Sequence, residues 1–382
     1  MKFGEIVRRM RGEGSRAETR AASATGCPLV LIDGINFFYR GAWSHAEVPD
    51  CHGEDISYVL AFFRNLARTA RRVGRAEFVV CWDGGYDERL RISSEAVAAG
   101  LIPKSYKQER REARETEDPE EKAKAEAFVR QMGVARDFLA HTVVGQCQAP
   151  GEEADDVIGS LARRFRDEFS RVLLVTTDRD YYQLIDEKTV IYDAKDGSEK
   201  GLDFLRREYG LSGGAQWIDV GALAGEAGKS SDTIYGVRGV GYATAAKMIA
   251  EFGTLEGVLS HARALVAENG ARDAAELAER VRSGRTKIAG VSRKSIDALA
   301  AEPVVRLARR LKEIRTFLDV DIPAKTPSYT EFTACFQRLG VPFPEADRDY
   351  LTDASNCPGT HGAINANSGG TPADMPEEPP LF

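Results

Sequence analysis

The amino-acid sequence predicts an α/β fold, a mostly parallel sheet flanked by helices, followed by an all-helical region. Four short apolar runs are typical of buried parallel strands, at residues 29–32, 78–82, 172–175 and 189–192. A helical stretch with an apolar face separates the first two runs, from about residue 55 to residue 73. From about Gly201 onward the periodicity is helical only. This order predicts a sheet with crossover helices first and a helical domain second.

The composition is that of a soluble globular enzyme, with 43% hydrophobic and 29% charged residues. At 382 residues the chain is long enough for one large or two medium domains. It has no apolar run of about 18 residues, so we expect no membrane-spanning helix and no membrane partner. Residues 1–26 lack the apolar segment of a secretory signal, and we expect a flexible leader or a short added helix there. A cytoplasmic location follows from these expectations.

The cysteines and histidines argue against zinc chemistry. The six cysteines are scattered and form no C-x-x-C pair, and the five histidines show no H-E-x-x-H spacing. This pattern argues equally against a disulfide framework and fits a reducing cytoplasm.

The net charge of −7, from 52 basic and 59 acidic residues, looks unfavourable for binding nucleic acid. The basic residues are concentrated, however, at 104–114, 163–171 and 280–315. A negative centre flanked by positive surfaces is compatible with binding a phosphate backbone.

Three predicted strands are followed by an aspartate: Asp33, Asp83 and Asp178. In open α/β sheets the carboxyl ends of the strands form the edge at which ligands bind. A single aspartate at such a position is explained better as a turn former or a helix cap than as a ligand. Three together favour a functional site.

A further acidic group lies at residues 151–156, Gly-Glu-Glu-Ala-Asp-Asp, and Asp180 adds another carboxylate. The dipole of a helix N-terminus explains one or two acids but not four in five positions. Two carboxylates about 4 Å apart repel each other by about 4 kcal/mol at an effective dielectric of 20, so their convergence requires cations. Oxygen ligands without His or Cys select Mg²⁺ or Mn²⁺, and two such ions suit hydrolysis of a phosphodiester.

Two other segments have both a structural and a functional interpretation. Residues 106–126 are highly charged, which indicates either a solvated helix or loop, or a mobile cover over the strand ends. The Gly-rich turn at 236–241 opens an amphipathic helix and, taken alone, is equally consistent with a helix-capping turn.

Six short motifs occur in the order seen in one family. They are Asp33-Gly34-x-Asn36, Trp82-Asp83-Gly84, Tyr106-Lys107-x-x-Arg110, Glu153-Ala154-Asp155-Asp156, Thr177-Asp178-x-Asp180 and Gly236-Val237-x-Gly239-Val240-Gly241. Together they resemble the flap endonuclease/5′→3′ exonuclease family, above all its bacterial polymerase-associated and bacteriophage members. The resemblance extends over residues 29–325.

This resemblance implies a PIN-like nuclease domain with a helical arch, joined to a helix–three-turn–helix domain that binds DNA through a helix-hairpin-helix. The expected boundaries are a leader at 1–26, a nuclease domain at 27–200 with its arch at 84–126, a DNA-binding domain at 201–325, a packing segment at 326–350 and a disordered tail at 351–382. The tail is expected to be solvated, with a short docking peptide as the alternative.

The resemblance also implies two divalent ions, Mg²⁺ or Mn²⁺. The first is assigned to Asp33, Asp83, Glu153 and Asp155, with Asp156 close by. The second is assigned to Asp178, Asp180 and Asp232, with Asp155 bridging the two ions.

The same comparison assigns roles in binding the nucleic acid. Lys107 and Arg110 match a basic pair that contacts the scissile phosphate, and Tyr106 lies at the matching spacing. Without the motif they would be an ordinary charged helix face. The residues implied to hold duplex phosphates are Gly236, Val237, Gly239, Val240 and Gly241, where family members often place K⁺ on backbone carbonyls.

One motif departs from the family pattern. Many relatives have Gly-Asp-x-x-Asp before the hairpin, whereas this chain has Lys229 at the first of those aspartates and Asp232 at the second. Alternatively, Glu226 supplies the missing carboxylate after a local insertion. We therefore expect a thinner shell of acidic ligands around the second ion than in most relatives.

The resulting prediction is a Mg²⁺-dependent 5′→3′ exodeoxyribonuclease or flap endonuclease of replication or repair, acting as a monomer. Its expected partners are 5′ flaps, 5′ ends and branched duplex DNA, with RNA primers as a further substrate. Two alternatives remain: a PIN-type ribonuclease, and a catalytically silent protein that binds DNA structures.

Overall fold

The computed structural model describes residues 26–42, 47–226 and 231–356. The expected leader lies outside these residues except for Gly26, as does the expected tail beyond Asn356. Lys229 also lies outside them. No helix in the described part of the chain is long and apolar enough to cross a membrane.

The centre of the molecule is a six-stranded sheet with the order β3-β2-β1-β4-β5-β6. The strands are β1 (Leu29–Asp33), β2 (Glu77–Trp82), β3 (Gly145–Gln148), β4 (Val172–Val175), β5 (Thr189–Tyr192) and β6 (Glu199–Lys200). All neighbours pair in parallel except β5 and β6, which are antiparallel. The chain proceeds from β1 outward to β3 and then returns to β4 on the other side of β1. The carboxyl ends of β1 and β4 therefore meet where the strand order reverses, the position that favours a binding crevice.

Helices cover both faces of the sheet, since successive strand residues point to opposite sides. Leu29 and Leu31 of β1 pack with α8 (Ala154–Phe165), whereas Val30 and Ile32 pack with α3 (Gly34–Ala42) and α4 (Ser57–Val73). The four strands predicted from apolar runs are confirmed. Missing from the prediction were α3, the two-residue β6, and β3, whose sequence Gly-Gln-Cys-Gln carries no apolar run.

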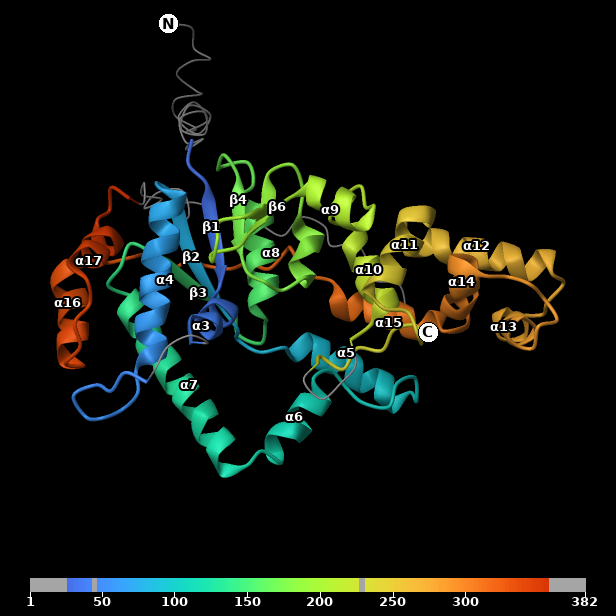
Figure 1. Ribbon diagram of the computed structural model, residues 1–382, viewed down its shortest axis with the longest axis horizontal. Coiled ribbons are helices and arrows are strands. Elements are labelled where there is room, and N and C mark those ends of the chain that lie inside the picture. Colours follow the sequence, from blue (N-terminus) through green and yellow to red (C-terminus); the bar gives the residue numbers. More distant parts are fainter. Residues whose placement is uncertain (1–25, 43–46, 227–230, 357–382) are drawn as a thin grey trace, which may run out of the picture.

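Two helices, α6 (Gln108–Glu115) and α7 (Pro119–Leu139), project from the body and meet at an angle below the carboxyl ends of the strands (Figure 1). No residue of α6 is buried, and the residues that α7 buries lie in its second half, where Phe138 and Leu139 join the core. The arch predicted at 84–126 therefore begins later than expected. Its first part, α5 (Asp87–Ala98), buries one face against the core and does not project.

The all-helical part extends from the sheet on the side opposite α16 and α17 (Figure 1). Its helices are α9 (Leu202–Tyr209), α10 (Gln216–Ala224), α11 (Tyr242–Phe252), α12 (Leu255–Glu268), α13 (Ala274–Arg282), α14 (Gly290–Ala300) and α15 (Glu302–Lys312). Helices α10 and α11 pack together and are joined through the Gly-rich turn at 236–241. One continuous core runs from β1 and α8 into α10, α11 and α15, so this part is packed against the sheet domain.

The chain from residue 326 onward contains α16 (Tyr329–Arg338) and α17 (Glu345–Thr352), which ends two residues beyond the predicted packing segment at 326–350. An aromatic cluster fastens it to α4 and α7. The ring of Phe336 lies 5.7 Å from Phe63 and 5.2 Å from Phe138, and it stacks on Phe343 at 4.4 Å. This cluster completes the core on the α4 face of the sheet.

We expect Phe336→Ala to lower the free energy of unfolding by about 3–5 kcal/mol, because it removes a buried ring from a filled core. The side chain is 2% exposed. Urea unfolding followed by circular dichroism measures the change. Phe317, which is 64% exposed, provides the matched control. Equal losses for Phe336→Ala and Phe317→Ala would show that the aromatic cluster contributes no packing energy.

Candidate active site

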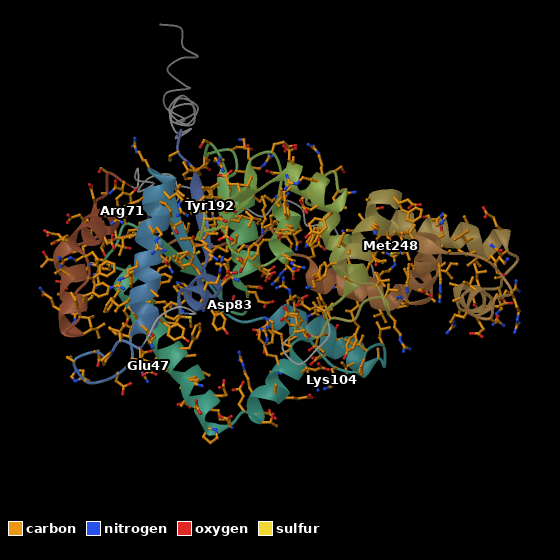
Figure 2. All side chains as sticks on the ribbon, viewed as in Figure 1. Glu47, Arg71, Asp83, Lys104, Tyr192 and Met248 are labelled. Carbon is orange, nitrogen blue, oxygen red and sulfur yellow. The ribbon has the colours of Figure 1, made fainter. Side chains whose placement is uncertain are left out.

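A cavity of about 290 Å³ opens at the carboxyl edge of the sheet. Strands β1, β2 and β4, the start of α8, the base of the arch and the segment before α11 all contribute to its lining. Asp83 lies at this end of the strands, above the angle between α6 and α7 (Figure 2). Seven of the eight predicted metal ligands line the cavity: Asp33, Asp83, Glu153, Asp155, Asp178, Asp180 and Asp232. These seven are called the cavity carboxylates below.

The carboxyl group of Asp33 lies at the centre of the sheet edge. It accepts hydrogen bonds from the backbone N–H of Asn36 at 3.0 Å and from the Tyr181 hydroxyl at 3.1 Å. Burial, and to a lesser extent the charge of Asp83, raises the pKa of Asp33 to about 6 against these hydrogen bonds. The free aspartate value is 3.8, so this carboxylate is held in a site that disfavours its negative charge.

The pKa of Asp178 is also raised, by burial of its carboxyl group and by the charge of Asp180. The residue as a whole is exposed, so the carboxyl faces the other acids while the remainder faces solvent. Asp178 Oδ1 accepts the backbone N–H of Asp180 at 2.9 Å, which fixes the two acids side by side.

Arg89 of α5 neutralises three acids at the start of α8. Its guanidinium lies 2.7 Å from Glu153, 3.3 Å from Asp155 and 2.6 Å from Asp156, and it is 4% exposed as a residue. Its Nε donates to the carbonyl oxygen of Leu311 at 3.0 Å. Burial lowers the pKa of Arg89, but the three carboxylates more than offset this and hold it well above its usual value.

Asp156 is placed differently from the other predicted ligands. It is fully buried, does not line the cavity, and is held between Arg89 and Arg315. The backbone N–H of Arg315 also donates to Asp156, at 2.7 Å. These contacts fasten α8 to the chain that leaves α15. Asp156, which was predicted to lie close to an ion, is therefore surrounded by two guanidinium groups. These contacts support a structural role for Asp156.

The base of the arch is attached to the same cavity. Lys107 has a left-handed backbone (φ 54°), and its N–H donates to the carbonyl oxygen of Asp232 at 2.8 Å. Its ammonium contacts the Glu153 carboxylate and lies 3.9 Å from that of Asp232. The Tyr106 hydroxyl donates to Glu153 at 3.0 Å, and Arg110 lies 3.6 Å from Asp232. The three residues predicted at the base of the arch, Tyr106, Lys107 and Arg110, therefore lie next to the predicted metal ligands Glu153 and Asp232.

Lys312, the last residue of α15, lies on the other side of the cavity. Its ammonium is 2.9 Å from Asp180 Oδ2 and 2.5 Å from Glu226 Oε2. Burial lowers the pKa of Lys312, but Asp180, Tyr242 and Glu226 hold it well above its usual value. The sequence interpretation named Glu226 as a substitute acid and did not foresee its lysine partner.

Arg89 and Lys312 are the functional residues that the sequence interpretation missed. Both had a signal, because each is a charged residue within an apolar helical stripe. Arg89 shares its face with Ile92 and Ala96, and Lys312 shares its face with Val305 and Ala308. A charged side chain at such a position needs a buried partner of opposite charge.

The hairpin turn brings two backbones together. A Cβ added at Gly236 would lie 2.4 Å from the backbone nitrogen of Gly225, so only glycine fits there. Gly239 adopts φ 72°, and Gly241 is the N-cap of α11. The side chains of Val237 and Val240 are buried, at 3% and 5% exposure. Their backbone N–H groups are engaged within the protein, because that of Val237 donates to the carbonyl oxygen of Leu223 at 2.8 Å and that of Val240 donates to the carbonyl oxygen of Val237 at 3.0 Å.

The donor chemistry of the cavity fits hard divalent cations, because all seven cavity carboxylates offer oxygen. Across the described ranges, however, no three Asp, Glu, His or Cys side chains are grouped so that they would hold an ion as they stand. Arg89, Lys107 and Lys312 contact oxygens of Glu153, Asp155 and Asp180. An ion bound by these three acids would have to displace the cations or share the acids with them.

The fold and the site together define a PIN-like domain, with an acidic cavity at the carboxyl edge of its sheet, joined to a helical domain through a hairpin. Two family models match in succession. The model described as "5′-3′ exonuclease, N-terminal resolvase-like domain" matches residues 28–210, and "5′-3′ exonuclease, C-terminal SAM fold" matches residues 213–334. A 5′-3′ exonuclease of Halalkalibacterium halodurans is 31% identical over 242 residues, covering 60% of this chain and 71% of that protein. The chain belongs to the 5′-3′ exonuclease family, as the sequence motifs predicted.

Other relatives are longer, and the structural relatives are more distant. The thermostable DNA polymerase I of Thermus thermophilus is 28% identical over 314 residues, which cover 81% of this chain but 32% of the polymerase. The chain thus spans about a third of that relative. The phage T5 5′-exonuclease with bound zinc superposes with a TM-score of 0.54 at 19% identity, covering 86% of this chain and 98% of that one. This likeness shows that the two chains share a fold.

We expect Asp33→Asn to alter the pH dependence of stability in metal-free protein. The pKa of Asp33 is about 6 in the folded protein and 3.8 in the unfolded chain. The free energy of unfolding is therefore highest below pH 3.8, where Asp33 is protonated in both states, and it falls as the pH rises through 6. Wild type should lose at most about 3 kcal/mol relative to the variant across this window. The comparison uses the change in free energy of unfolding with pH and not its absolute value, because asparagine also has one hydrogen-bond acceptor fewer than aspartate.

Urea unfolding in EDTA at a series of pH values measures this difference. Asp203→Asn serves as the control, because the Asp203 side chain is 94% exposed. Parallel stability curves for wild type and Asp33→Asn would contradict the raised pKa. Saturating Mn²⁺ should remove the difference if the ion compensates the same charge.

Proposed function

We propose that this chain is a metal-dependent, structure-selective 5′-nuclease that hydrolyses phosphodiesters at DNA 5′ flaps and 5′ ends. The observation that carries the proposal is the convergence of seven carboxylates with the basic base of the arch in one cavity. Membership of the 5′-3′ exonuclease family supports the reaction class. Mg²⁺ is the proposed physiological ion, and K⁺ at the hairpin is a further proposal from the family resemblance.

The cavity divides into two groups of acids. Asp33, Asp83, Glu153 and Asp155 would hold one divalent ion, and Asp178, Asp180 and Asp232 would hold a second, with Asp155 between them. Bound ions would activate a water molecule and stabilise the charge of the leaving oxygen. We assign Asp156 to the support of α8, because both of its oxygens are engaged by arginines.

Lys107 and Arg110 would place positive charge beside the phosphate that enters the cavity. Both lie at the base of the arch, close to Asp232. A cation fixed at the edge of a partly enclosed cavity stabilises charge that develops on a phosphate more than one in open solvent. The exposed guanidinium of Arg110 can reach a substrate, whereas the more buried Lys107 first has to release Glu153.

The hairpin would hold the duplex and thereby position the strand that enters the cavity. Its turn presents backbone groups and the N-terminus of α11, which bind phosphates without reading base sequence. Helix α10 packs against α15, whose last residue, Lys312, lines the cavity, so the hairpin is joined to the cavity through packed helices. Selectivity for a branched structure would arise from the spacing between hairpin and cavity.

Cleavage of end-labelled 5′-flap DNA tests the proposal, with matched single-stranded RNA as the competing substrate. Reactions contain Mg²⁺, Mn²⁺ or EDTA. We expect cleavage of the flap that requires metal and is lost in Asp155→Ala. Cleavage of RNA alone would establish a PIN-type ribonuclease instead, and DNA binding without cleavage in any metal would establish a catalytically silent protein.

Arg110→Ala should slow flap cleavage on the order of 100-fold, because it removes charge stabilisation at the reacting phosphate. Duplex affinity should change by less than about threefold, since a single exposed contact contributes little to binding. Single-turnover cleavage and fluorescence anisotropy measure the two effects. Arg114→Ala, from the exposed end of α6, is the matched control. Equal losses of rate and affinity would contradict a catalytic role for Arg110.

A further inference from the structure

Lys312 is a buried cation placed between Asp180, which lines the cavity, and Glu226, which does not. Its side chain is 2% exposed, whereas Asp180 and Glu226 are 20% and 41% exposed. Lysine is rarely buried to this extent unless it is paired. The ammonium is thus enclosed by the protein, while both of its partners are partly exposed to solvent.

The position of Lys312 is fixed by several independent contacts. The backbone carbonyl oxygen of Lys312 accepts a hydrogen bond from Gln183 Nε2 at 3.0 Å. Oε1 of the same Gln183 side chain accepts one from the backbone N–H of Ile314 at 2.9 Å. Its methylene chain runs past Gly221 of α10, where an added Cβ would lie 3.5 Å from Cγ. The end of α15 is therefore held on both sides, and the ammonium is directed at the acids by the backbone.

Glu226 is held in place with comparable firmness. It forms an isolated antiparallel bridge with Ile234, with N–O distances of 2.6 and 2.7 Å in the two directions. Its carboxylate is therefore presented to Lys312 by a paired backbone. The neighbouring acid Asp180 is tied to Asp178 through its own N–H. Backbone hydrogen bonds thus hold Asp180, Lys312 and Glu226 in the positions at which their charged groups meet.

We propose that the ammonium of Lys312 is a built-in cation that takes the place of tightly bound second-ion charge at Asp180 and Glu226. A divalent ion held by Asp178, Asp180 and Asp232 would have to displace the ammonium from Asp180 or bind beside it, and like charges at such distances repel. The protein therefore binds one divalent ion tightly and a second weakly. The inference rests on the proposed function only for the identity of the cavity as a metal site.

Mn²⁺ binding to the full chain tests the proposal directly. Free Mn²⁺ is counted by electron paramagnetic resonance during titration of wild type, Lys312→Met and Lys188→Met. Methionine keeps an unbranched apolar chain and removes the charge. We expect wild type to bind one Mn²⁺ tightly, and Lys312→Met to bind the second at least about tenfold more tightly than wild type.

Lys188→Met is the matched control, because Lys188 forms a surface ion pair with Asp167 far from the cavity acids. It should titrate as wild type does. Thermal unfolding supplies a second readout: Lys312→Met should melt lower than wild type in EDTA and gain more from Mn²⁺. Unchanged second-ion affinity in Lys312→Met would overturn the proposal.

Wild type alone also suffices if Lys312→Met does not fold. Two Mn²⁺ ions bound with equal high affinity by wild type would overturn the proposal without any variant. The result is independent of the nuclease test. Tighter second-ion binding in Lys312→Met would support the proposal whether or not flap DNA is cleaved, and failure of flap cleavage would overturn the proposed nuclease function only.

Discussion

Compensation of negative charge at the carboxyl edge of the sheet is the constraint on which the rest of the structure depends. Seven acids line one cavity, and burial, with a smaller contribution from the charge of Asp83, raises the pKa of Asp33 to about 6. The protein supplies Arg89, Lys107 and Lys312 as internal counter-charges. Without them, bringing these acids together would cost more free energy than a domain of this size has to spare.

The same counter-charges join separate parts of the chain. Arg89 comes from α5 but donates to the carbonyl of Leu311 at the end of α15. Lys107 links the base of the arch to Asp232, before the hairpin. Arg315 fastens the chain after α15 to Asp156 of α8. The acidic cavity is therefore also the junction of sheet, arch and helical domain, so a change in the charge of the cavity acts on how these parts are held together.

The sheet and most of the acids could be predicted from local sequence. A strand buried on both faces reads as an apolar run, and an aspartate directly after it must lie at the carboxyl edge. The edge strand β3 carried no such run, and α5 could not be told from the arch without its packing partners. The counter-charges were missed because their partners are distant in sequence: Arg89 and Asp156 are 67 residues apart, and Lys312 and Asp180 are 132 apart.

The departure at Lys229 illustrates this limit. Comparison of the local motif placed the change in the second acid group at Lys229, three residues before Asp232. Lys229 lies outside the described residues. The described structure instead shows a lysine from α15 among these acids, with Glu226 as its second partner. Glu226 without Lys312 would leave an additional negative charge uncompensated next to Asp180. Glu226 and Lys312 therefore have to be considered together. With the ammonium included, Asp180, Glu226 and Lys312 carry less negative charge than the two acids would carry alone.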